Sequence, residues 1–192
     1  YKEDSLSLVT YTPTWRKYSE DFGHLDFDAL NDFARKHQIM FIIKLHSKHN
    51  CDLNSGNYSN IIEYDRYADI YPLLSITDLM ITDYSSIYLD FLLLDKPIIF
   101  FPYDCEEYIK GERELLLDYH EITPGPKCYT QSKLQEEIFT HLVKGIDKHK
   151  PQRKELRDKF FNYKDGDSSK RLWLTIKDSL LKKHNISLQE PK

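Results

Sequence analysis

The sequence predicts an α/β fold in which helices cover both faces of a parallel sheet. Five short apolar segments alternate with segments of helical periodicity along the first half of the chain. The apolar segments have the length of strands and contain few polar residues, which is typical of strands buried on both sides. These observations favour a sheet whose strands are joined by helical crossovers.

The first elements alternate from the beginning of the chain. Residues 6–11 are apolar and predict the first strand, and a helix is expected over residues 26–37. A buried strand is expected at residues 39–45 and a short strand at residues 60–64. The polar residues 50–59 between them predict a loop.

The most informative segment follows these elements. Asp69 is expected to cap a short helical turn, and residues 79–81 predict the fourth strand. This strand stops at the polar turn of residues 82–86, after which apolar residues recur at helical spacing from Ile87. Residues 97–101 predict the fifth strand. The segment therefore reads as strand, polar turn, helix and strand.

Beyond residue 101 the pattern becomes irregular. The Pro124-Gly125-Pro126 segment predicts a turn, because proline and glycine interrupt regular structure. Three further helices are expected at residues 132–144, 151–161 and 168–183. No internal repeat accompanies them.

Composition limits the classes of function. The chain has 192 residues, a net charge of -4 and a pI near 6.1, which argues against nonspecific nucleic-acid binding. Charged residues interrupt its longest apolar region, so no membrane-spanning helix is predicted. Cys51, Cys105 and Cys128 form no CxxC pair, which fits a cytoplasmic location. Because the chain starts at Tyr1 and not at Met, we expect a piece of a larger protein that lacks a partner lobe.

Polar residues gather where the predicted strands end. In an open parallel sheet, ligands bind beyond the carboxyl ends of the strands. Arg16 follows the first strand, Lys44 and His46 end the second, and a turn rich in hydroxyl groups follows the fourth. Two cations, an imidazole and a hydroxyl-rich helix start suit a diphosphate. The chain has no glycine-rich phosphate loop, so helix ends and side chains must form the phosphate site.

The turn after the fourth strand has two interpretations. Thr82, Ser85 and Ser86 can hold a phosphate at the helix N-terminus, or they can cap the helix and do nothing more. Asp83 can orient the turn. Arg16 has a second interpretation too, because an arginine beside a tryptophan is often a solvated or stacked surface charge.

Metal binding has only a weak signal. His49 follows His46 by three residues, and Cys51 and Asp52 come next, but no complete ligand set at zinc spacing accompanies them. We therefore expect no metal site. A divalent ion is permitted but not required, because helix ends and cations can stabilise a departing phosphate without it.

Several segments occur in an order that resembles the CDP-glycerol glycerophosphotransferase family of teichoic-acid and capsule polymerases. The likeness extends over residues 8–180, and the combination of a TPTWR-like and a TDYSS-like segment is specific. The segments are Tyr11-Thr12-Pro13-Thr14-Trp15-Arg16, Lys44-Leu45-His46, Asp78-Leu79-Met80-Ile81-Thr82-Asp83-Tyr84-Ser85-Ser86, Lys96-Pro97, Tyr103-Asp104, Pro124-Gly125-Pro126 and Asp165-Gly166.

The resemblance implies a GT-B architecture, in which two Rossmann-like lobes face each other across a cleft. Residues 1–192 are then the C-terminal lobe, which binds the nucleotide-activated donor, and the N-terminal acceptor lobe is absent from the chain. The implied reaction transfers a polyol phosphate from its CDP ester to the end of a polymer and releases CMP. Glycerol phosphate is the first candidate for the transferred group. The implied partners are a CDP-polyol, a polyol-phosphate polymer and the acceptor lobe.

The resemblance also implies roles for individual residues. His46 is implied as the catalytic histidine at the donor diphosphate, and Ser47 departs from the family, in which proline usually follows this histidine. The general base is implied to lie in the absent lobe. The donor phosphates are implied to be bound by Arg16, Thr82, Ser85 and Ser86, with Thr14, Lys44, Asp83, Pro124 and Gly125 in support.

Other functions stay open at this point. The donor can instead be CDP-ribitol or a nucleotide sugar, and the lobe can be a catalytically silent nucleotide binder. A receiver-like signalling domain is disfavoured, because the first strand ends in Thr-Pro-Thr and Lys96-Pro97 precedes its strand. The cluster Lys182-Lys183-His184 permits peripheral contact with the inner face of the membrane but is too short to predict it.

Overall fold

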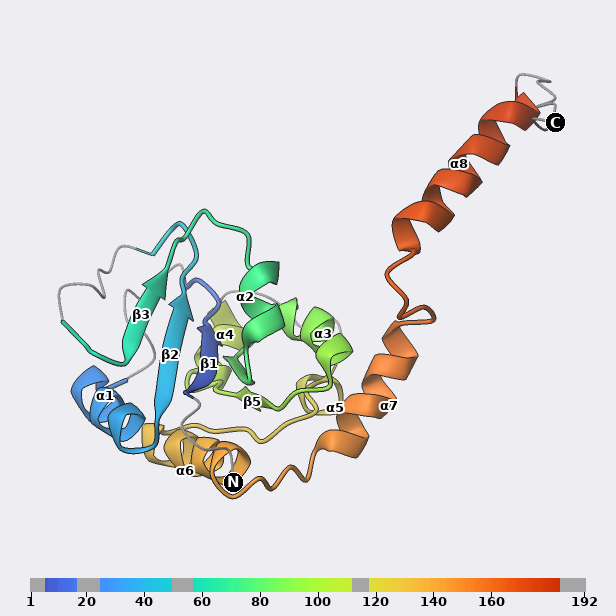
Figure 1. Cartoon of the computed structure of the whole chain (residues 1–192). Coiled ribbons are helices and arrows are strands. Elements are labelled where there is room, and N and C mark those ends of the chain that lie inside the picture. Colours follow the sequence, from blue (N-terminus) through green and yellow to red (C-terminus); the bar gives the residue numbers. More distant parts are fainter. Residues whose placement is uncertain (1–5, 17–24, 50–56, 112–117, 184–192) are drawn as a thin grey trace. The chain divides into compact units, whose positions relative to one another are not determined.

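The computed structural model of the chain describes residues 6–16, 25–49, 57–111 and 118–183 (Figure 1). It contains two compact units, Tyr1–Arg157 and Asp158–Lys192, which are considered separately below. The first unit holds the sheet and every residue of the predicted site. The second unit holds the last helix.

The first unit is built on a five-stranded parallel sheet, as the sequence predicts. Its strands lie in the order β3-β2-β1-β4-β5. They are β1 (Ser7–Thr12), β2 (Ile39–Lys44), β3 (Ile61–Tyr64), β4 (Leu79–Thr82) and β5 (Ile98–Phe100). The strand bounds differ from the predicted ones by at most one residue at each end.

The strand order places a topological switch at the centre of the sheet. The chain runs outward from β1 through β2 to β3 and then returns to pair β4 with the other edge of β1. This is the order of a Rossmann-like half, in which loops diverge beyond the carboxyl ends of the two central strands. The loops after β1 and β4 are therefore placed to border a ligand.

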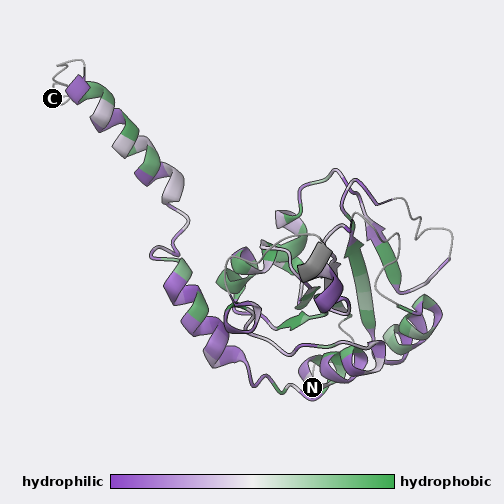
Figure 2. Cartoon of the chain, turned by 180° about the vertical axis from the view of Figure 1, so that it is seen from behind, coloured by the Kyte–Doolittle hydropathy of each residue, from purple (hydrophilic) through white to green (hydrophobic). Residues whose placement is uncertain are grey.

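Helices cover both faces of the sheet because neighbouring residues of a strand point to opposite sides. On one face, Leu79 and Ile81 of β4 belong to the same apolar cluster as residues of α1 (Phe27–Lys36) and α6 (Gln131–Leu142). On the other face, Met80 belongs to a second cluster with residues of α2 (Tyr71–Ile76), α3 (Ile87–Phe91), α5 (Tyr119–Ile122) and α7 (Lys150–Phe160). All four residues of β4 are buried. The apolar strands stand out in the hydropathy colouring of Figure 2.

The helices mostly follow the predicted pattern. Asp26 is the N-cap of the first helix, where its Oδ1 accepts the Ala29 N–H at 3.0 Å. The helix predicted from Ile87 ends as a 3-10 turn at Asp95, which has a left-handed φ of 52°. The helices of the first unit are α1 (Phe27–Lys36), α2 (Tyr71–Ile76), α3 (Ile87–Phe91), η2 (Leu92–Leu94), α4 (Cys105–Gly111), α5 (Tyr119–Ile122), α6 (Gln131–Leu142) and most of α7 (Lys150–Phe160).

The second unit contains α8 (Ser168–Lys183), the helix predicted at these residues. Asp165 lies just before it and forms a bidentate pair with Arg171, with N–O distances of 2.9 and 3.0 Å. None of its residues is buried, and apolar and polar residues alternate along it in Figure 2. Within the described ranges, no helix is long and apolar enough to cross a membrane.

Candidate active site

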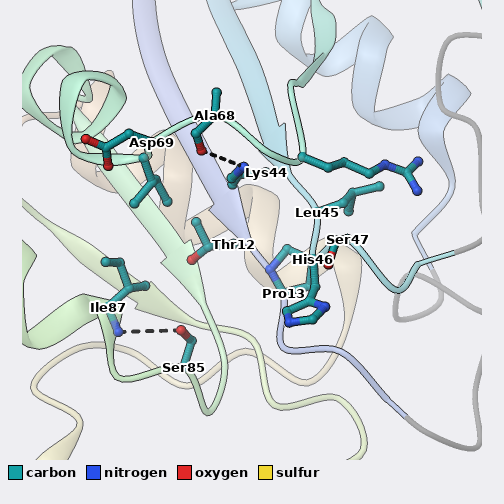
Figure 3. A pocket seen from close by; sticks show the side chains of 12 residues that line it. Thr12, Pro13, Lys44, Leu45, His46, Ser47, Ala68, Asp69, Ser85 and Ile87 are labelled. Atoms are coloured by element: carbon teal, nitrogen blue, oxygen red, sulfur yellow. Dashed lines mark hydrogen bonds between the residues drawn. The ribbon is translucent and has the colours of Figure 1, made fainter.

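A pocket of about 450 Å³ opens beyond the carboxyl ends of β1 to β4 (Figure 3). Each of these four strands contributes residues from the loop that follows it, as expected for the switch point of the sheet. The lining residues are Thr12, Pro13, Lys44, Leu45, His46, Ser47, Arg66, Ala68, Asp69, Ile70, Ser85 and Ile87. The predicted residues Lys44, His46 and Ser85 therefore share one cavity.

His46 projects from the loop after β2, and its ring lies near Pro13 in Figure 3. The ring Nδ1 accepts the backbone N–H of Lys48 at 3.2 Å. A neutral ring that accepts at Nδ1 carries its proton on Nε2. The Nε2–H group has no hydrogen-bond partner in the part of the chain that the structure describes, so it is available to a ligand.

Two cations line the pocket, and only one of them was predicted. The Lys44 Nζ atom donates to the carbonyl oxygens of Asp65 at 2.6 Å and Ala68 at 3.0 Å. Burial lowers the pKa of Lys44. Arg66, from the loop after β3, pairs with Glu63 and donates to the carbonyl oxygen of His49. The pocket lining thus contains two cationic side chains, of which Lys44 was predicted and Arg66 was not.

The three hydroxyl groups predicted to bind phosphate after β4 lie in different environments. Ser85 lines the pocket, and its Oγ accepts the Ile87 N–H at 3.4 Å, which is long for a helix cap. Ser86 is exposed, occupies the N-cap position of α3 and makes no side-chain cap bond. Thr82 is fully buried and donates to the carbonyl oxygen of Thr12 at 3.0 Å. Of the three predicted phosphate ligands, only Ser85 borders the cavity.

Asp83 binds the loop after β1 to the loop after β4, as the orienting role predicted for it requires. Its carboxylate accepts the Thr14 backbone N–H at 3.0 Å and the Thr14 hydroxyl at 2.6 Å. It also accepts Arg16 Nη1 at 2.6 Å and the backbone N–H of Tyr84 at 2.6 Å. Thr14 therefore supports the site through Asp83 and does not line the pocket.

Arg16 does not occupy the predicted position beside the pocket. Its guanidinium is buried and makes a bidentate pair with Asp104, with N–O distances of 2.8 and 2.9 Å. Burial alone would lower the pKa of Arg16, but the hydrogen bonds to Asp104 and the charge of Asp83 raise it. A cation already neutralised by two carboxylates has little charge left for a donor phosphate. The direct phosphate contact predicted for Arg16 does not fit this geometry.

Aromatic rings enclose the same ion pairs. The Arg16 guanidinium lies 5.1 Å from the ring centroid of Tyr84 and 5.2 Å from those of Tyr103 and Tyr108. Tyr84 donates to Asp104 Oδ1 at 3.1 Å, and burial together with the Asp104 charge raises its pKa. We call Arg16, Asp83 and Asp104 the arginine clamp, because they join the loops after β1, β4 and β5.

Pro124 and Gly125 also lie outside the pocket. Both are buried beside β5, where Phe100 N–H donates to the Pro126 carbonyl at 2.9 Å. A Cβ atom at Gly125 would lie 2.2 Å from the carbonyl oxygen of Ile98, so glycine permits a close approach of two backbones. These two residues therefore support the fold beside β5 and do not line the pocket.

The described residues contain no group of three His, Cys, Asp or Glu side chains that could hold a metal ion. Cys51 and Asp52, which the weak zinc signal included, lie outside the described residues. His184 of the basic C-terminal cluster also lies outside them. His46 and His49 contact each other through backbone groups, as described below.

Comparison with protein families identifies the relatives of this chain. Residues 2–178 match the family model of CDP-glycerol:poly(glycerophosphate) glycerophosphotransferases, which covers most of the chain. The chain belongs to this family. The match confirms the resemblance carried by the segments around Arg16, His46 and Ser85.

Two relatives of this glycerophosphotransferase family member are named for different polyol phosphates. A teichoic acid poly(ribitol-phosphate) polymerase of Bacillus spizizenii is 31% identical over 172 residues, which are 86% of this chain and 27% of the relative. A teichoic acid glycerol-phosphate primase of Bacillus subtilis is 34% identical over 170 residues, which are 86% of this chain and 42% of the relative. The chain therefore spans less than half of each relative.

A solved structure supports the fold of this family member. A variant of the wall teichoic acid polymerase TagF superposes with a TM-score of 0.76 at 28% sequence identity. The superposition covers 92% of this chain and 44% of the TagF chain. The match agrees with the predicted fold, a Rossmann-like lobe of a GT-B protein with a parallel sheet and helices on both faces.

Proposed function

We propose that this chain is the donor-binding part of an enzyme that transfers a polyol phosphate from a CDP-activated donor to the end of a teichoic-acid-like or capsular polymer, with release of CMP. The observation that carries the proposal is the pocket at the switch point of the sheet. It combines Lys44, Arg66, the Nε2–H of His46 and the hydroxyl of Ser85 in a member of the glycerophosphotransferase family. These groups suit a nucleoside diphosphate ester.

The proposed chemistry is an in-line phosphoryl transfer. An acceptor hydroxyl oxygen bonds to the phosphorus that bears the polyol, and the bond from this phosphorus to the bridging oxygen of CMP breaks. CMP leaves with increased negative charge on its phosphate. Two of the three N–H groups of Lys44 bind carbonyl oxygens, so the third can donate to this phosphate together with Nε2–H of His46. Such contacts strengthen as the charge develops, which accelerates the reaction.

We assign the base that takes the hydroxyl proton to an acceptor lobe outside this chain. The relatives are more than twice as long as the matched region, which leaves room for such a lobe. The cationic and hydroxyl groups of the pocket fit a leaving phosphate better than an alcohol to be deprotonated. Asp83 is fully buried and already accepts hydrogen bonds from Thr14 and Arg16.

A ribitol phosphate donor is the second candidate. Ribitol-phosphate and glycerol-phosphate enzymes match the chain with similar identity, 31% and 34%. The structure of a TagF variant has been determined after a soak with CDPG. We favour glycerol phosphate, and a direct comparison of the two donors decides between them.

A thermal-shift experiment tests the nucleotide preference. The chain is heated with CMP, CDP, CDP-glycerol, CDP-ribitol, UDP-glucose or ADP, because a ligand of the folded state raises the melting temperature. Saturation at 100 times Kd stabilises the fold by about 2.7 kcal/mol. We expect the cytidine diphosphate esters to stabilise most. Equal or greater stabilisation by UDP-glucose would contradict the proposal.

A second experiment tests the catalytic role of His46. We expect His46→Ala to reduce turnover by about two to four orders of magnitude in the protein that also carries the acceptor lobe. His120→Ala is the matched control, because His120 is exposed and lies outside the pocket. Near-normal turnover in a folded His46→Ala protein would remove His46 from the mechanism.

A third experiment tests the division of labour between lobes. We expect the 192-residue chain to bind CDP-glycerol without forming polymer, because transfer also requires a positioned acceptor and a base. Addition of the acceptor lobe, fused or as a separate chain, should restore synthesis. A divalent ion can accompany the donor diphosphate, and its contribution is measured by adding EDTA to the same assay. Polymer formation by the chain alone would contradict the assignment.

A further inference from the structure

The loop that carries His46 is closed by hydrogen bonds between two histidines. The His49 N–H donates to the His46 carbonyl at 3.0 Å, which forms a tight turn. The His46 backbone N–H donates to the Nδ1 atom of His49 at 3.1 Å. We call these contacts, together with the bond from Lys48 N–H to His46 Nδ1, the histidine latch.

The latch determines which atom of His46 faces a ligand. Because Lys48 N–H occupies Nδ1, the neutral ring presents an Nε2–H donor. The opposite tautomer would place two N–H groups against each other at 3.2 Å. Trp15 borders the same ring, with centroids 6.3 Å apart. The orientation of His46 therefore depends on the backbone conformation of residues 46–48.

His49 anchors the loop to the rest of the fold. The side chains of Ser47 and Lys48 are exposed, whereas His49 is half-buried. The His49 carbonyl accepts a hydrogen bond from Arg66, which lines the pocket. Burial lowers the pKa of His49, which favours its neutral ring. The Nδ1 atom lies 3.2 Å from the His46 carbonyl oxygen and 3.1 Å from the His46 backbone nitrogen, and the tautomer with its lone pair on Nδ1 accepts the His46 N–H.

We propose that His49 is a positioning residue for the reaction, which holds the His46 loop so that Nε2–H points to the donor diphosphate. The role rests on the proposed function of His46. A displacement of about 1 Å in a catalytic group can reduce a rate by about 100-fold, so a side chain that fixes this loop matters for donor binding and transfer. His49 itself does not line the pocket.

Two substitutions of similar size test the role. In His49→Asn, the amide oxygen can occupy the place of Nδ1 and accept the His46 N–H, whereas the longer His49→Gln side chain places its amide one bond further out. We expect His49→Gln and His49→Ala to weaken CDP-glycerol binding by about 3- to 10-fold, as for one lost hydrogen bond. We expect His49→Asn to remain within about 2-fold of the original chain, because the hydrogen bond is kept. His120→Gln is the control, and calorimetry gives the affinities.

Nitrogen-15 NMR of His46 separates positioning from a general loss of stability. In the original chain and in His49→Asn, the shifts should show a neutral ring protonated at Nε2. In His49→Gln and His49→Ala, the two nitrogens should approach averaged shifts. Equal behaviour of the Asn and Gln variants would overturn the proposal, and so would an unchanged His46 signal in His49→Ala. If neither the original chain nor any variant binds CDP-glycerol, the proposed function is wrong. The NMR result then still tests the histidine latch.

Discussion

Arg16 Nη1 lies 2.6 Å from Asp83 Oδ2, and both side chains are almost completely buried. Asp104 holds the other edge of the same guanidinium, so three loops at the carboxyl ends of β1, β4 and β5 meet in the arginine clamp. The clamp lies outside the pocket lining but joins the loop that follows Thr12 to the loop that contains Ser85. Its geometry indicates a support for the site and not a ligand of the donor.

Asp83→Asn should destabilise the protein strongly. The substitution leaves Arg16 buried with half of its compensating charge, and loss of one partner of a buried pair typically costs about 3–5 kcal/mol. Urea denaturation measures the change in the free energy of unfolding. Glu136→Gln, which breaks an exposed pair with Lys133, should have no measurable effect. Similar small effects for both variants would show that the clamp does not stabilise the fold.

Ser85→Ala together with Ser86→Ala should weaken CDP-glycerol binding by about 2 kcal/mol or more, because hydroxyl donors to the phosphate are lost. The single substitutions refine this expectation. Most of the loss should come from Ser85, which lines the pocket, since Ser86 does not. Calorimetry measures the affinity, and Ser75→Ala outside the pocket is the control. Unchanged affinity with a lower melting temperature would assign both serines to helix capping alone.

Gly125→Ala should reduce stability without changing donor affinity. The added methyl group would lie 2.2 Å from the Ile98 carbonyl oxygen, and the displacement needed to relieve such overpacking costs about 1–3 kcal/mol. Gly145→Asn is the control, because Gly145 has open space and a positive φ of 66°, which asparagine tolerates. Weaker CDP-glycerol binding in a fully folded Gly125→Ala protein would instead show that Gly125 contributes to the binding site.

Stability should fall as the pH is lowered from 7.5 to 5.5. Burial lowers the pKa of His149, and the charges of His141 and Lys127 lower it further. The unfolded chain then binds more protons at this residue than the folded chain does. The contribution of neutral His149 to the free energy of unfolding is therefore fully present above the ordinary histidine pKa of about 6.5 and decreases as the pH falls below it. Urea denaturation at several pH values measures the slope. His149→Gln should reduce this slope and His120→Gln should not; equal slopes would exclude His149 as a source.

The sequence predicted the sheet well because buried parallel strands leave a clear signal. Strands β2, β4 and β5 are nearly continuous apolar runs, and the last helix has distinct boundaries. The short helices α4 and α5 were missed, since four to seven residues show too little periodicity. The order of the strands was also not predicted, because apolar runs do not specify their neighbours.

The site was predicted in part by the same reasoning. Lys44, His46 and Ser85 were identified because they follow strand ends, and they do share a pocket. Arg66 was missed although it follows β3 by two residues, so the strand-end rule could have found it. The position of Arg16 could not be predicted, since a linear sequence does not show that two distant carboxylates, Asp83 and Asp104, converge on one guanidinium.

Most of the residues that line the pocket lie in loops, while the apolar core belongs to the sheet and its covering helices. Loops of this kind accept substitutions and insertions far more readily than buried strands do. A change in one loop therefore alters one side of the pocket, while the remaining loops and the core stay unchanged. The buried scaffold and the lining of the pocket can therefore diverge separately in this architecture.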